Sequence, residues 1–134
     1  MQVSELRHDE AVYLDGDRLE EICHQLGYTG GEVAICAAME DLASLMSAAG
    51  KLWQAGDVAT LECTARQIIG VAERIGMSGL ARVAGDVMAL AATPDSGPLG
   101  ESHLATALSA TVARLRRVGE QSLLAIWDRQ DLTI

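Results

Sequence analysis

Apolar residues recur at spacings of three and four along four stretches of this chain, which is the pattern of amphipathic helices that bury one face. Residues 31–55 form the first stretch, with the stripe Ile35, Met39, Leu42, Met46, Ala49 and Trp53. The second follows Asp57 and carries Val58, Leu61, Ala65, Ile68, Ala72 and Ile75. The third follows Ser78 and carries Leu80, Val83, Ala84, Val87, Met88 and Ala91. The last begins near Ser102, ends at Trp127 and carries Leu104, Leu108, Val112, Leu115, Val118, Ser122 and Ile126.

Residues that start and stop helices separate these stretches. A further short helix, RLEEICHQLG over residues 18–27, precedes them. Helix-starting side chains are predicted at Asp17, Thr29, Asp57 and Ser78, and helix-ending glycines at Gly27, Gly56 and Gly76. The run TPDSGP over residues 93–98 holds both prolines of the chain and is predicted to be a loop.

Connections of only a few residues cannot cross the length of a bundle, so consecutive long helices must alternate in direction. The sequence therefore predicts an all-α fold, an up-down-up-down four-helix bundle with a short extra N-terminal helix. A length of 134 residues fits one such domain, over residues 16–134. Residues 1–15 are polar and acidic without a sustained period and are predicted to form an N-terminal arm. An aromatic content of 3%, with no Phe, also favours helices over sheet.

The formal net charge of −9 is not that of a nucleic-acid-binding surface, which needs clustered Lys and Arg. The densest basic group, Arg114, Arg116 and Arg117, is predicted to be a solvated helix face. The N-terminal stretch, residues 1–19, has no apolar run of signal-peptide length, and the chain has no 18 uninterrupted apolar residues. We therefore expect a cytoplasmic protein that binds neither nucleic acid nor membrane.

The cysteines and carboxylates of the chain match no known pattern of a catalytic or metal-binding site. Cys23, Cys36 and Cys63 lack a C-x-x-C pair and are predicted to be packing residues. The carboxylates that could be imagined as a di-metal set lack the Glu-x-x-His pattern, and we expect them on solvated faces: Glu40, Asp41, Glu62, Glu73 and Asp86. The chain also lacks both glycine-rich phosphate-binding motifs, G-x-G-x-x-G after a strand and G-x-x-x-x-G-K-S/T. We accordingly expect no catalytic residue, no metal and no cofactor, and a protein that is not an enzyme.

The stretch ARQIIGVAERIG, residues 65–76, raises a more specific question. Gly70 stands inside a predicted helix, where glycine costs about 1 kcal/mol relative to alanine. Arg66 lies four residues earlier and therefore on the same face. One interpretation of the residues alone is that Gly70 lets two helices pack closely.

Residues 65–84, ARQIIGVAERIGMSGLARVA, resemble the central hairpin of histidine phosphotransfer (HPt) domains, whose long helix carries A-H-x-L-K-G-S. The positions that match this hairpin are small or apolar: Ala65, Ile68, Gly70, Gly76, Leu80 and Ala84. Arg66 stands where the family has its phosphoaccepting histidine, and Ile69 replaces the lysine. Arginine stays protonated and offers no nucleophilic lone pair, so it cannot accept a phosphoryl group.

The resemblance implies a non-catalytic module of bacterial two-component signalling, which docks a receiver or histidine-kinase domain without carrying phosphate. It places the docking site at Arg66, Ile69, Gly70 and Glu73, with Arg66 as a fixed cation for the partner's acidic phosphorylation pocket. The resemblance also implies a second interpretation of Gly70, which would keep the helix surface low where the partner docks. One alternative is a structural homodimer unrelated to phosphorelays, paired through exposed Leu45, Leu52 or Leu124. A third hypothesis keeps phosphotransfer through a displaced histidine, His24 or His103. His8, in the predicted arm, is the remaining histidine.

Overall fold

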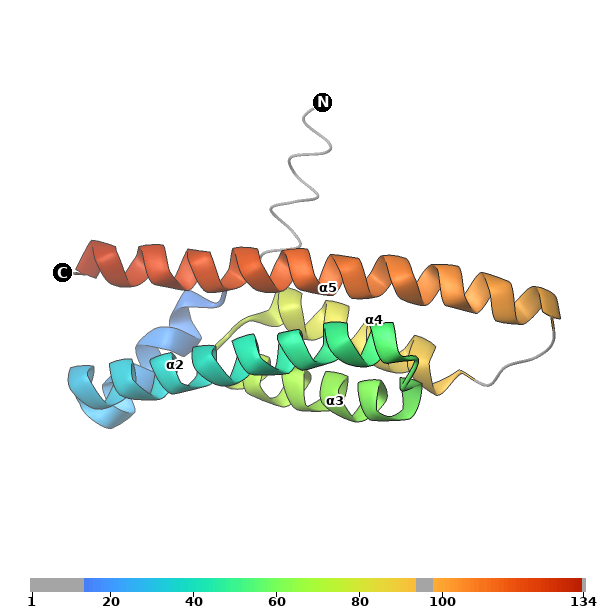
Figure 1. Cartoon of the computed structure of the whole chain (residues 1–134). Helices are drawn as coiled ribbons and strands as arrows, with labels where there is room; N and C mark the ends of the chain where they lie inside the picture. The colour runs from blue at the N-terminus through green and yellow to red at the C-terminus, as the bar shows by residue number, and fades with distance from the viewer. Residues whose placement is uncertain (1–13, 94–97, 134) are drawn as a thin grey trace, which may run out of the picture.

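The computed structural model describes residues 14–93 and 98–133, and gives side-chain surroundings for 14–93 and 104–127. All regular secondary structure in the described part of the chain is helical, with no strand (Figure 1). Its four helices are α2 (Gly16–Ala55), α3 (Val58–Arg74), α4 (Ser78–Ala92) and α5 (Pro98–Thr133). α2 packs against α3 and α5, and α4 packs against α3 and α5. This closed set of neighbours is consistent with a four-helix bundle.

α2 is interrupted at the predicted glycine. Gly27 has φ 80° and ψ 165°, a conformation that breaks the helical path inside Gly16–Ala55. The predicted capping residue was wrong, because the carboxylate of Asp15 accepts from the N–H groups of Asp17 (3.1 Å) and Arg18 (3.2 Å). Helical residues resume at Tyr28, directly after the break, so Thr29 does not start the second stretch. Of the predicted arm, only Leu14 and Asp15 are described, and Leu14 packs against the core.

The other helix ends follow the sequence in part. Gly56 ends α2 in the left-handed conformation, and Asp57 accepts from the N–H of Thr60 at 3.2 Å, both as predicted. Gly76, with φ 77°, follows α3 as predicted. Ser78 was predicted to cap α4 but is its first residue, and the preceding Met77 makes no side-chain cap.

α5 is longer at both ends than the predicted helix. It begins at Pro98 rather than near Ser102, and it runs beyond Trp127 to Thr133. Proline suits a first helical position, because the N–H that it lacks has no helical partner there. The predicted loop of residues 93–98 is therefore shorter than expected, and its residues 94–97 lie outside the described part.

The predicted stripes supply most of the core, although some of their members, such as Met46, Val58 and Met88, are only half-buried. On α3 the stripe residues Leu61, Ala65, Ile68, Ala72 and Ile75 are buried, and on α5 so are Leu108, Val112, Leu115, Val118, Ser122 and Ile126. Two of the leucines predicted to be exposed, Leu45 and Leu52, are instead half-buried against this core, whereas Leu124 is 62% exposed. α2 contacts both α3 and α5, and half-buried residues such as Leu45 and Leu52 lie beside its buried stripe.

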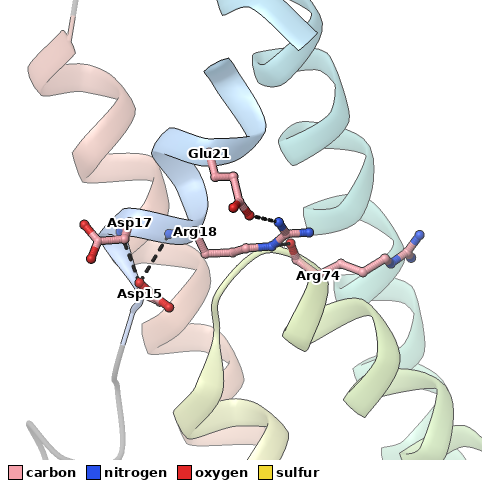
Figure 2. Close-up of polar contacts among 5 residues, drawn as sticks. All are labelled: Asp15, Asp17, Arg18, Glu21 and Arg74. Atoms are coloured by element: carbon pink, nitrogen blue, oxygen red, sulfur yellow. Dashed lines mark hydrogen bonds and ion pairs between the residues drawn. The ribbon is translucent and has the colours of Figure 1, made fainter. Parts of the chain in front are cut away.

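The start of α2 is fastened to the turn between α3 and α4. The N–H of Asp15 donates to the carbonyl of Gly76 at 2.7 Å. Nε of Arg18 donates to the carbonyl of Arg74 at 3.0 Å, and its guanidinium also pairs with Glu21 (Figure 2). The carbonyl of Arg74 belongs to the last turn of α3, where it has no partner within the helix. Arg18, at the beginning of α2, therefore supplies a hydrogen-bond donor to a carbonyl at the end of α3.

By length and composition alone, one described helix could cross a membrane, namely α2. Core helices of soluble proteins pass the same test, and α2 contributes Ile35, Leu42 and Ala49 to the core. The finding is therefore weak evidence for a membrane span.

Candidate functional site

Gly70 lies on the outer face of α3, and no packing requirement accounts for it. A Cβ added there would meet no atom within 4 Å. Gly31 and Gly119 differ, because a Cβ at either would press into Cys23 or Met46 respectively. The interpretation that Gly70 lets two helices pack closely is therefore wrong. The residue instead leaves an exposed point on the helix without a side chain.

This open point forms part of a shallow groove between α2 and α3, with a volume of about 590 Å³. α3 contributes Gln67, Gly70, Val71 and Arg74, and α2 contributes Asp41, Ser44 and Leu45. The α3 residues have the spacing i, i+3, i+4, i+7, which in coiled coils surrounds one side chain of a facing helix. Because one of these four is glycine, the groove has room for a bulky side chain over α3.

The groove combines an apolar floor with a polar rim. Val71 is buried and Leu45 half-buried, while Asp41, Gln67 and Arg74 are exposed. Within the described residues, neither the carboxylate of Asp41 nor the guanidinium of Arg74 takes part in an ion pair. One anion and one cation on the rim are thus available to a partner of complementary charge.

The four residues predicted as the site are only partly brought together. Gly70 lines the groove, but Arg66, Ile69 and Glu73 do not. The Arg66 side chain is 68% exposed and pairs with Glu62 at 3.3 Å, within the same helix. Ile69 is half-buried against the core, and Glu73 is exposed. Arg66 and Gly70 thus share one exposed face, whereas Ile69 is directed partly inward.

Of the residues that line the groove, only Gly70 was predicted from the sequence to belong to the site. The spacing of Gln67, Gly70 and Arg74 at three and four marks one polar face of α3, and it could have identified this half of the groove. Asp41 and Ser44 belong to α2, and their approach to α3 depends on how the two helices pack. No local signal in the sequence carries that information.

The other candidate chemical groups lie apart from the groove. His24 is exposed on α2 before Gly27, while His8 and the side chain of His103 lie outside the described residues. In the described part of the chain, no three His, Cys, Asp or Glu side chains are grouped so as to hold a metal ion. Cys63 was predicted to be a packing residue but is exposed, whereas Cys23 and Cys36 are half-buried.

Comparison of the chain with protein-family models, with curated proteins and with solved structures found no match. The function must therefore be argued from the groove, from the exposed face of α3 and from the resemblance of residues 65–84.

Proposed function

We propose that this chain is a protein-docking module of bacterial two-component signalling, with its docking face on α3 and the adjoining groove. In this proposal the helices form an up-down-up-down bundle with a short extra N-terminal helix, and the chain works in the cytoplasm. The partner is a receiver or histidine-kinase domain. The chain binds that partner without accepting a phosphoryl group.

The observation that carries the proposal is that Gly70, a helical glycine with empty space around it, lines the groove. A glycine in a helix interior costs about 1 kcal/mol relative to alanine, and here no neighbouring atom requires it. The cost is explained if the groove floor must stay low for a side chain of a partner. The i, i+3, i+4, i+7 set around Gly70 has the arrangement that receives such a side chain.

Arg66 supplies the charge that the proposed partner requires. It lies one turn before Gly70, and its only ion pair in the described residues is with Glu62, also on α3. Exposed pairs of this kind are worth little, so Arg66 can turn to an acidic pocket at low cost. In this proposal, which here rests on the resemblance to HPt domains, the acidic pocket belongs to a receiver domain and faces the position that a phosphoaccepting histidine would occupy.

Titration of the full chain with purified receiver and histidine-kinase domains from the same organism tests the docking face. We expect one of them to bind, and Gly70→Arg to weaken that binding by about tenfold or more, or at least 1.4 kcal/mol, because the arginine fills the groove. Arg66→Glu should weaken it as well, by reversing the charge. The matched control is Gly85→Arg on α4, where an added Cβ also meets nothing within 4 Å. Equal affinity for the Gly70→Arg and Gly85→Arg chains, or no binding at all, would contradict the proposed docking face.

Incubation with a phosphorylated receiver domain tests whether phosphate is transferred. We expect the chain to remain unlabelled, because arginine occupies the position of the phosphoacceptor. Acid-labile label that disappears in His24→Ala or His103→Ala would show transfer through a displaced histidine and would contradict this part of the proposal.

A further inference from the structure

α5 carries a second stripe, on the face opposite its core stripe. Six exposed residues follow one another at alternating spacings of three and four: Ala110, Ala113, Arg117, Glu120, Leu124 and Trp127. Leu124 is 62% exposed and Trp127 is 54% exposed. α5 lies along one side of the other helices, and no other described helix covers this face (Figure 1). Alternating spacings of three and four make the heptad repeat of a coiled-coil seam, here without a partner helix.

The stripe is complementary to itself when its direction is reversed. Its C-terminal half presents the large side chains of Leu124 and Trp127, and its N-terminal half presents two alanines. Arg117 and Glu120 stand in the middle with opposite charges. In an antiparallel pair of α5 helices centred between these two residues, Leu124 faces Ala113, Trp127 faces Ala110 and Arg117 faces Glu120.

We propose that a second copy of this chain covers the stripe, with two α5 helices packed antiparallel about a two-fold axis between Arg117 and Glu120. The contact is isologous, so each size match and each charge pair occurs twice. A parallel pair would instead bring Arg117 against Arg117 and Glu120 against Glu120, and like charges oppose such a pairing. Charge thus selects the antiparallel direction, and size fixes the register.

The charges of the monomer are suited to this pairing. Arg117 makes no ion pair within the described residues, while Glu120 pairs only with Arg116 on the same helix, at 3.6 Å. The stripe from Ala110 to Trp127 extends over about 26 Å at 1.5 Å per residue. Two helices in contact over this length form a modest interface, and we expect a dimer that dissociates on dilution.

This dimer goes beyond the proposed docking function and does not depend on it. The stripe on α5 and the groove between α2 and α3 share no residue. Variants of one surface therefore leave the other unchanged, and either proposal can fail alone.

Sedimentation or light scattering of the full chain over a concentration series is the test. We expect a mass approaching twice 14.2 kDa at high concentration. Leu124→Glu should give a monomer throughout the same series. Arg117→Glu and Glu120→Arg should each weaken the dimer about tenfold or more, and the double variant R117E/E120R should restore it. Restoration is specific to the antiparallel pairing, because only there do positions 117 and 120 face each other.

Arg82→Glu is the matched control, since Arg82 is exposed on α4 and makes no ion pair in the described residues. It should leave the dimer intact, and circular dichroism should show an unchanged helical content in every variant. A chain that is monomeric at all concentrations would overturn the proposal. So would a dimer that tolerates Leu124→Glu, or a double variant as weak as the single ones.

Discussion

Replacing Gly76 with alanine is expected to lower the free energy of unfolding by about 2 to 4 kcal/mol. The residue has φ 77°, a left-handed conformation in which a side chain costs about 1 to 2 kcal/mol. An added Cβ would also lie 2.9 Å from the carbonyl oxygen of Asp15 and 3.2 Å from Cβ of Arg18. The crowded oxygen belongs to the backbone, so it cannot move aside as a flexible side chain could. Relief of the contact would displace the start of α2 and strain the hydrogen bond from Asp15 to Gly76. Urea denaturation followed by circular dichroism measures the loss.

Gly56→Ala is the matched control for this effect. Gly56 has nearly the same φ, 76°, but an added Cβ there meets nothing within 4 Å. Its substitution should therefore cost only the backbone strain of about 1 to 2 kcal/mol. The loss in free energy of unfolding at Gly76 beyond that at Gly56 measures how firmly the beginning of α2 is held against the α3–α4 turn. Equal losses at the two glycines would show that this close approach adds nothing to stability.

The core was the part of the fold that the sequence predicted best. The apolar stripe of α3 is one example, since each member from Leu61 to Ile75 is buried at the expected spacing. Burial of one face requires only that apolar residues repeat every 3.6 positions, and this repeat is visible in the sequence itself. The helix break at Gly27, the helix end at Gly56 and the cap at Asp57 could be predicted equally well, because glycine and aspartate act on the adjacent backbone.

Features that depend on distant contacts were predicted less well. Asp17 and Asp15 are both suitable caps by residue type, but Asp15 lies where its N–H meets the carbonyl of Gly76, far away in the sequence. The same limit applies to the candidate site. The common face of Arg66 and Gly70 was visible in the sequence, but the empty space around Gly70 was not. Asp41 joins this face only through the packing of α2 on α3. Periodicity indicates which face of a helix is buried, and it does not indicate which residue of a neighbouring helix lies opposite.

Ile68→Ala should cause the other large loss of stability, about 2 to 5 kcal/mol. Ile68 is fully buried in the middle of α3, so its truncation removes buried carbon atoms and leaves a cavity. Alanine favours the helix slightly more than isoleucine does, which offsets only a few tenths of a kcal/mol. Chemical denaturation of the two chains, with the same denaturant dependence assumed for both, gives the difference.

Ile69→Ala is the control that connects this measurement to the docking face. Ile69 is the next residue along α3 and is only half-buried, so the same truncation should cost about 1 kcal/mol. Successive residues of an α-helix are separated by about 100° around its axis. If Ile68 is directed into the core, Gly70 lies about 200° away from it, on the outer face that forms the groove. A larger loss at Ile69 than at Ile68 would therefore mean that α3 is rotated. Gly70 would then be directed away from the groove, and the docking proposal would lose the observation that carries it.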